Sequence, residues 1–306
     1  MVAVQRRGVS VALIVTFVAT LAPAAMAGPL ASGDAPCLPY SDQSLAIREI
    51  QYTTDPNGVS PHDGYVVDCA GGICTGKYAG NRPRIILQDP DDPSGWGGIQ
   101  VKDWTLGDLF DNVNVGDWVS LENVLVEEFV GNTLLQWQTA YNPQYTIVSR
   151  GNPLPPPLLV TAGEIPAPIY DPNNFTWYVD NHDAERYESM RLVVQGVAVT
   201  DMDHGKAQDN YNLRDWCGHD CWAADYMNED VGPWGYHPSI TNGRRFCEVS
   251  GVLEQYTSRY AGWDYYQLLT LTSDDLTIPC LVNLADVAQA QTEVGPASAT
   301  DVADWP

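Results

Sequence analysis

One proline-rich segment near the middle of the 306-residue chain constrains its fold more than any other feature. Residues 151–157 read Gly-Asn-Pro-Leu-Pro-Pro-Pro, and such a run lacks most of the backbone N–H groups that a helix or a sheet needs. The segment is expected to be extended and stiff, and to separate the regions on either side of it. The sequence therefore predicts a domain over residues 46–150, a linker over 151–158 and a second domain over 159–280.

A weak internal repeat supports this division. Short blocks in the first half match blocks in the second half at one constant offset of 127 residues, obtained by subtracting their numbers. Three blocks in one register indicate a tandem duplication. The matched blocks are Val66-Val67 with Val193-Val194, Gly116–Val119 with Gly243–Phe246, and Glu127–Phe129 with Glu254–Tyr256.

Each half is expected to consist of about five short strands, because runs of β-branched and aromatic residues are bounded by Gly, Pro, Asn and Asp. Only brief segments, such as Thr105–Phe110, Thr161–Ile165 and Cys221–Met227, could be helical. This pattern predicts an all-β protein of two small closed barrels. The expected strands are Tyr65–Cys69, Arg84–Gln88, Gly98–Val101, Trp118–Val126 and Thr133–Trp137, then Arg191–Thr200, Tyr211–Arg214, Phe246–Leu253 and Tyr265–Leu271.

Several turn and strand-start motifs occur in a recognisable order. They include Ser60–Gly64, Gln88–Pro90, Gly97–Ile99 and Glu128–Thr133, followed in the second half by Tyr187–Met190 and Gly251–Glu254. This order resembles the tandem OB-fold-like modules of secreted bacterial endonucleases and related exported proteins. In those nucleases a catalytic domain of the endonuclease/exonuclease/phosphatase type usually follows. The Ser-Asp-His segment and the Asn-x-His step of that domain do not occur here, so the resemblance implies accessory modules without the nuclease.

The first residues indicate export. Residues 1–27 carry Arg6-Arg7, an apolar run and an Ala25-Met26-Ala27 cleavage site, which predicts a signal peptide and a secreted or cell-surface protein. An N-terminal arm over 28–45 and an acidic tail over 281–306 would flank the barrels. The apolar run is too short for a transmembrane helix. After cleavage the chain would hold 13 Lys and Arg against 39 Asp and Glu, a net charge of −26, which disfavours nucleic acid as a partner.

The mature chain holds seven cysteines, and in an exported protein these predict disulfide bonds. Cys69 with Cys74 and Cys217 with Cys221 are close enough in sequence to close small loops, and Cys247 could pair with Cys280 or Cys37. The odd number leaves at least one thiol free or bonded to another chain.

Two segments are candidate metal sites. Asp89, Asp91 and Asp92 could offer oxygen ligands to calcium, although Asp, Pro, Ser and Gly in this loop favour a solvated turn. Cys217, His219 and Cys221 could bind zinc, but oxidation outside the cell favours a disulfide. The sequence predicts no cofactor with certainty, and calcium is the one that it leaves possible.

Aromatic residues cluster in the second half and form a candidate interaction surface, with a barrel core as the alternative explanation. Tyr265 and Tyr266 are adjacent on a predicted strand, so they face opposite sides of it, and at least one should face away from its own core. The candidate surface comprises Trp222, Trp234, Tyr260, Trp263, Tyr265 and Tyr266.

These features predict a secreted, non-catalytic interaction or structural protein. The strings G-x-S-x-G, H-E-x-x-H and the P-loop are absent from the sequence, and no other motif indicates catalysis. Self-assembly through the segment 281–306 and the flanking Cys37 and Cys280 is one hypothesis, with a protein partner or a second copy of the chain as the ligand. The alternatives are an accessory nucleic-acid-binding protein and a carbohydrate-binding module.

Overall fold

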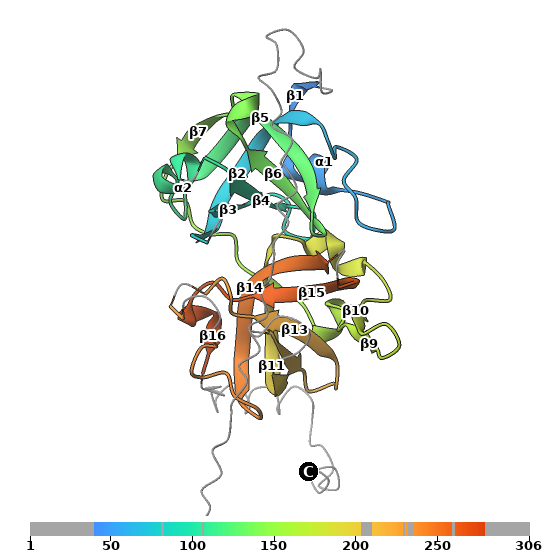
Figure 1. The fold of residues 1–306 in the computed structure, drawn as a ribbon. Coiled ribbons are helices and arrows are strands. Elements are labelled where there is room, and N and C mark those ends of the chain that lie inside the picture. The colour runs from blue at the N-terminus through green and yellow to red at the C-terminus, as the bar shows by residue number, and fades with distance from the viewer. Residues whose placement is uncertain are drawn as a thin grey trace, which may run out of the picture. The chain divides into compact units, whose positions relative to one another are not determined.

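The protein is all-β, as the sequence predicts. The computed structural model describes residues 40–80, 83–105, 107–202, 210–228, 230–231, 236–258 and 261–278. Two seven-stranded sheets follow each other along the chain, and a separate two-stranded hairpin accompanies the second (Figure 1). Both sheets belong to one compact unit of the chain.

The first sheet closes into a barrel. Its strands lie in the order β1-β2-β3-β4-β6-β5-β7, and β2 also pairs with β5, so the five strands from β2 to β6 form a closed ring. The closing pair β2–β5 is antiparallel, whereas β4 and β6 run parallel. The strands are β1 (Tyr40–Leu45), β2 (Val66–Tyr78), β3 (Arg84–Gln88), β4 (Gly98–Asp103), β5 (Trp118–Phe129), β6 (Asn132–Trp137) and β7 (Gln144–Ser149), and the helices are α1 (Ile47–Gln51), α2 (Asp108–Asn112) and the 3₁₀ turn η1 (Thr139–Tyr141).

The second sheet closes in the same way. Its order is β16-β14-β15-β13-β12-β11-β8, β14 also pairs with β11, and β13 runs parallel to β15. The strands are β8 (Leu158–Leu159), β11 (Arg191–Met202), β12 (Asn210–Arg214), β13 (Asp220–Ala224), β14 (Arg245–Ser258), β15 (Trp263–Leu269) and β16 (Leu276–Thr277); the hairpin is β9 (Ile169–Asp171) and β10 (Thr176–Tyr178); the 3₁₀ turns are η2 (Ala162–Glu164), η3 (Asp183–Tyr187) and η4 (Ser273–Asp275).

The strand order confirms the predicted barrel architecture. In both rings, counted from its first strand, the order is first, second, third, fifth and fourth, which is a five-stranded Greek-key arrangement of the kind that OB-folds use. The fourth strands, β5 and β14, begin at Trp118 and Arg245, which are 127 residues apart by subtraction and so keep the offset of the sequence repeat. The duplication itself stays a prediction.

Each barrel has a core of its own, formed by the alternate residues of its strands. Ile85, Val101 and Leu121 are typical of the first core, and Val197, Leu213 and Phe246 of the second. The predicted helix over Cys221–Met227 is wrong, because Asp220–Ala224 forms strand β13 against β12. The short apolar run Cys221–Ala224 is fully enclosed there, and enclosed strands lose the alternation that distinguishes a strand from a helix.

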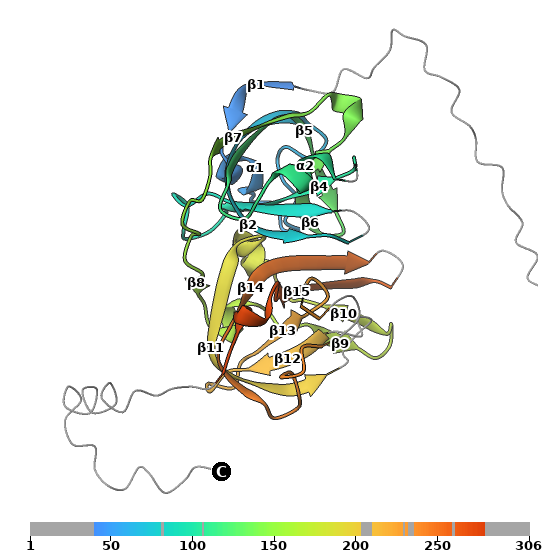
Figure 2. The same cartoon turned by 90° about the vertical axis from the view of Figure 1, so that its left-hand side faces the viewer.

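Figure 2 shows β14 of the second barrel next to β6 of the first. Polar side chains of β3 and β6 join the two barrels at β14. The Arg84 guanidinium lies 3.3 Å from the Glu254 carboxylate, and the Asn132 side-chain amide donates to the Gln255 carbonyl at 2.6 Å. Gly98 packs so closely on the backbone of Ser189 that a Cβ there would lie 2.3 Å from a backbone carbon. The outer face of β3 and β4 is therefore covered by the second barrel.

Candidate functional site

The hairpin β9–β10 carries the most exposed cluster of large apolar side chains among the described residues. Its strands pair antiparallel, with Tyr170 opposite Trp177, around a Pro-Asn-Asn turn. The Asp171 carboxylate organises that turn by accepting hydrogen bonds from the Asn173 backbone N–H at 2.8 Å and the Asn174 side-chain amide at 2.7 Å. These donors lower the pKa of Asp171, because they stabilise its charged form.

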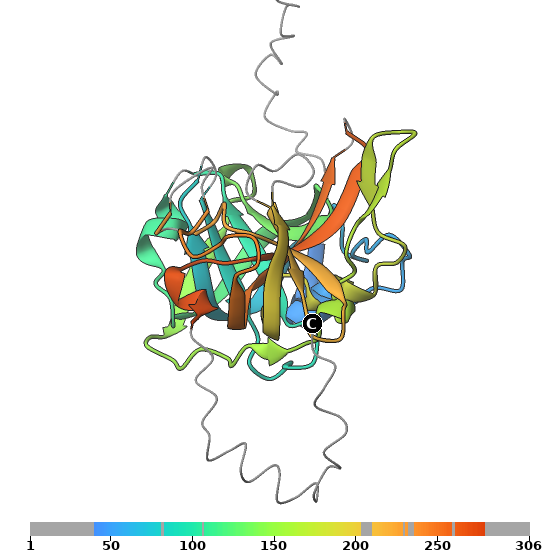
Figure 3. The ribbon, with the colours of Figure 1, turned by 90° about the horizontal axis from the view of Figure 1, so that it is seen from below.

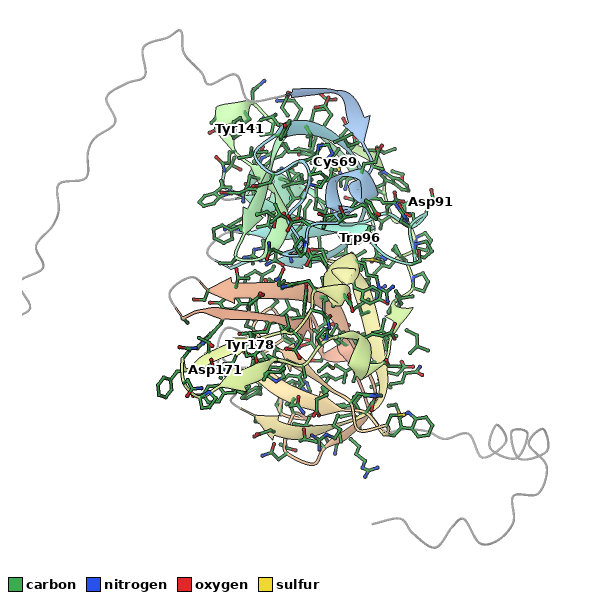
Figure 4. All side chains as sticks on the ribbon, turned by 90° about the vertical axis from the view of Figure 1, so that its right-hand side faces the viewer. Cys69, Asp91, Trp96, Tyr141, Asp171 and Tyr178 are labelled. Atoms are coloured by element: carbon green, nitrogen blue, oxygen red, sulfur yellow. The ribbon has the colours of Figure 1, made fainter. Side chains whose placement is uncertain are left out.

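The exposed side chains of this hairpin are apolar and aromatic. Phe175 is 72% exposed and has a φ of 57°, a left-handed conformation that is unusual for a bulky residue and that indicates a locally constrained backbone. Figure 4 shows Asp171 and Tyr178 at the outer side of the second barrel. The exposed side chains, together called the aromatic hairpin surface, are Ile169 at 40%, Tyr170 at 43%, Phe175 at 72% and Tyr178 at 39%.

A row of stacked rings holds the hairpin on the barrel. The ring of Trp177 lies 4.8 Å from that of Tyr170 and 4.8 Å from that of Trp222 on β13. Trp222 in turn packs on Tyr265 of β15 at 4.9 Å. Figure 3 shows the hairpin beside β15, standing out from the second barrel. Offset and edge-to-face ring pairs at these distances are attractive, so the hairpin is an anchored platform rather than a loose loop.

This arrangement is suited to binding. Exposed Tyr and Phe side chains offer large contact areas with few rotatable bonds, and they lose little conformational entropy when a partner covers them. The surrounding side chains are polar or acidic, with Asn173, Asn174 and Asp180 exposed beside the rings. An apolar patch with a polar rim is the usual composition of a recognition surface.

No protein-family model and no curated protein matches this chain. Of the helices in the described part of the chain, none has the length and hydrophobicity that a bilayer crossing requires.

The predicted disulfide between Cys69 and Cys74 is wrong, because both are buried free thiols. Both lie on β2, where a five-residue separation spans roughly 16 Å, whereas the Cα atoms of a disulfide lie within about 7 Å. Burial raises the pKa of the Cys69 thiol to about 12 and that of Cys74 to about 11.

The predicted Cys217–Cys221 disulfide is also wrong, since both thiols are free. Cys221 is buried on β13 opposite Leu213, whereas Cys217 is exposed in the turn between β12 and β13. Cys247 is disulfide-bonded. Cys37 and Cys280 lie outside the described residues, so the assignment of their partners stays a prediction.

The two candidate metal sites do not form. No three His, Cys, Asp or Glu side chains converge in a metal-binding arrangement among the residues that the structure describes. Asp89 accepts a hydrogen bond from the Asp91 backbone N–H at 2.9 Å, and Asp92 pairs with Arg48 at 3.0 Å. The loop that was a calcium candidate is therefore an ordinary Asx turn with an ion pair at its end.

In the zinc candidate, His219 is directed to a carboxylate instead of a thiolate. Its Nδ1 lies 3.2 Å from the Asp215 carboxylate, and its backbone N–H donates to the same side chain at 2.9 Å. Cys217 is exposed at the turn, whereas Cys221 is buried in the core. The string Cys217–Cys221 thus forms the β12–β13 turn and the start of β13.

The predicted aromatic surface is largely wrong as well. Trp222, Tyr265 and Tyr266 are buried, and Trp263 is partly buried with its indole N–H donating to the Phe175 carbonyl at 3.3 Å. Tyr265 and Tyr266 are adjacent on β15, but other segments cover both of them. Trp222 of β13 and Tyr256 of β14 pack on the ring of Tyr265, and the Tyr266 hydroxyl donates to Glu185 of η3. Trp234 and Tyr260 lie outside the described residues.

Sequence reasoning missed the residues that are exposed. Ile169-Tyr170-Asp171 and Thr176-Trp177-Tyr178 flank a Pro-Asn-Asn turn, and alternating apolar residues around such a turn are a hairpin signal. The two runs are only three residues long, which is short for a strand prediction. Taken as a pair, they could have located the surface.

Proposed function

We propose that the protein is a secreted, non-catalytic binding protein that contacts a protein partner, or a second copy of itself, through the aromatic hairpin surface. The exposure of Tyr170, Phe175 and Tyr178 on one anchored hairpin carries this proposal. Interface hot spots are rich in such rings, particularly where a rigid element presents them. The export signal and the lack of a catalytic motif in the sequence support the same function.

The covered faces of the barrels support a protein partner over nucleic acid. In OB-folds, oligonucleotides bind on the face of the second and third strands. In the first barrel these strands are β3 and β4, where Arg84 is paired with Glu254 of the second barrel. In the second barrel they are β12 and β13, where Trp222 is covered by Trp177 of the hairpin. The excess of acidic residues adds repulsion from phosphates.

Sedimentation velocity of mature protein over a wide concentration range tests self-association. A triple variant Y170A/F175S/Y178A removes the exposed rings of the hairpin, and W216S removes an indole that is 84% exposed on the β12–β13 turn instead. Association that is lost in the triple variant and kept in W216S would support the surface.

A photo-crosslinking amino acid at position 175, compared with the same group at 216, tests for a different protein partner in the extracellular fraction of the producing cells. Specific capture at 175 alone supports the proposal. A uniform monomer together with equal capture at both positions would contradict it.

A carbohydrate partner is the second candidate, because the amide groups of Asn173 and Asn174 lie exposed beside the rings. Aromatic faces stack on sugar rings, and neighbouring amides can bond hydroxyl groups. Binding to immobilised polysaccharides that disappears in the triple variant and persists in W216S would favour this candidate over a protein partner.

A further inference from the structure

A second, separate site lies where the first barrel meets the segment leading into β11. A cavity of about 420 Å³ opens there, which is within the usual size of small-molecule sites. The lining comes from both halves of the chain. The residues that line it are Thr53, Asp55, Trp96, His182, Asp183, Glu185 and Arg186.

Trp96 forms an aromatic wall of the cavity that is fixed in position. Its φ is 68°, and its backbone N–H donates to the Arg186 carbonyl at 2.5 Å, which ties this loop of the first barrel to the η3 segment. Its ring packs edge-on against Tyr52 at 5.5 Å. Figure 4 shows Trp96 at the end of the first barrel that is closer to the second. A fixed indole is a favourable surface for a cation.

Glu185 is the one nearly buried carboxyl in the lining, at 4% exposure. The Tyr266 hydroxyl donates to its Oε2 at 2.7 Å and is the one hydrogen-bond donor that reaches this side chain from the described residues. The Glu185 side chain is part of the lining of the cavity. Gly58 packs against the carboxyl so closely that a Cβ there would lie 2.7 Å from it, so the carboxyl has no room to turn away.

The groups around Glu185 are mostly acidic or neutral. Glu128 on β5, Glu188 at the end of η3 and Asp264 on β15 all act electrostatically on this cluster. His182 contacts the same Tyr266 hydroxyl at 3.0 Å through Nδ1 and lies 3.4 Å from Asp264 through Nε2. Burial is the main cause that raises the pKa of Glu185, to about 8, with Glu128 and Asp264 adding to it.

Arg186, the arginine in the cavity lining, does not neutralise the acidic groups around Glu185, because it is directed elsewhere. Arg186 lies 3.6 Å from Glu164 and stacks on the ring of Tyr187 at 4.5 Å. Asp55 and Asp183 are exposed at the cavity and add negative charge. Across the described residues no three ligating side chains converge on a metal ion, and the cavity is larger than a bare ion needs.

We propose that this cavity binds an organic ammonium group, with its charge on Glu185 and its apolar part on the Trp96 ring. Binding exchanges one cation for another. The Glu185 carboxyl releases its proton to solvent and the carboxylate forms an ion pair with the incoming R–NH₃⁺, so the total charge balances. A ligand cation paired with a buried carboxylate in this way satisfies a group that would otherwise be unpaired.

Calorimetric titration of the full mature chain with n-butylammonium tests the proposal, with n-butanol and glucose as neutral probes. Because the proton must leave, the dissociation constant should increase about tenfold for each pH unit below about 8. Titrations in two buffers of different ionisation enthalpy should show about one proton released per ligand below that pH. E185Q should abolish binding, W96L should weaken it, and E122Q, on the exposed side of β5, should leave it unchanged.

Binding of the ammonium alone, with the expected pH dependence and loss in E185Q, supports the site. Equal binding of n-butanol or glucose, no binding up to about 10 mM at about pH 9, or ammonium binding that E185Q leaves intact would overturn it. Circular dichroism shows whether E185Q folds. If it does not, the pH dependence of binding, the proton release of the unmodified protein and the affinity of W96L decide between support for the site and its refutation.

Discussion

Replacing Glu185 with Gln should make the protein more stable at alkaline pH. Gln has nearly the same shape, and its side-chain carbonyl can still accept the Tyr266 hydroxyl that now donates to Glu185 at 2.7 Å. The substitution removes only the ability to carry a negative charge at a position that is 4% exposed. Its effect on stability should therefore depend on pH.

The magnitude follows from the raised pKa of Glu185. Burial, with Glu128 and Asp264, moves this pKa from 4.5 to about 8, a difference of about 3.5 units by subtraction. The folded state then binds a proton that the unfolded state releases, so the free energy of unfolding falls as pH rises from about 4.5 through about 8. At ~1.4 kcal/mol per unit the upper bound is ~5 kcal/mol, and relaxation around the charge reduces this to ~2–4 kcal/mol.

Thermal unfolding by calorimetry at about pH 5, 7 and 9 measures this difference. E185Q should match the parent near pH 5 and melt several degrees above it near pH 9. E122Q is the control, because it makes the same Glu-to-Gln change at an exposed position. Its melting temperature should equal that of the parent at every pH. Parallel curves for E185Q and the parent across the whole range would refute the reasoning.

Three further changes test other parts of the fold. W222A should lower the free energy of unfolding by ~3–5 kcal/mol in chemical denaturation, because a nearly buried indole packs on both Trp177 and Tyr265. An unchanged midpoint would mean that the ring row does not support the barrel. R84A should lower the free energy of unfolding by ~3–5 kcal/mol, because Glu254 then stays buried without its cation. The double variant R84M/E254M should recover much of this loss. A double variant as unstable as R84A would contradict the pairing. Cys69 and Cys74 should react with an alkylating reagent only after unfolding, as mass spectrometry can show, because burial raises both pKa values; rapid native labelling at about pH 8 would contradict their placement.

The strands were predictable from sequence because their signal is local. The predicted strand Arg84–Gln88 matches β3 at both ends. The predicted strand Trp118–Val126 omits only the last residues of β5, which ends at Phe129. Both runs are bounded by Gly, Pro or Asp and filled with β-branched or apolar side chains. Five such strands were predicted in the first half and four in the second, where β13 was missed, and this number of short strands is typical of small barrels.

The site was harder to predict, because burial of an aromatic ring depends on segments that are distant in sequence. Trp222 was predicted to be exposed, in a segment that could be helical, but Trp177, forty-five residues earlier by subtraction, covers its ring. Glu185 gives no sequence signal at all, since its burial depends on Gly58 and Tyr266 from other segments. The exposed hairpin was missed for the opposite reason, since three-residue strands fall below the length at which periodicity is visible.

The closing of each ring by its fourth strand also has a consequence for how the chain folds. β2 can complete its pairing only when β5, some forty residues further along, is available, and β4 must wait for β6 before their parallel ladder forms. Such non-local pairings make folding slow, on the order of milliseconds to seconds for a barrel of this size. All strands of the first barrel precede Leu158, so during synthesis it can close before the second is complete. Its β3–β4 face, with Arg84 already in place, would then be available to pair with Glu254 when β14 forms.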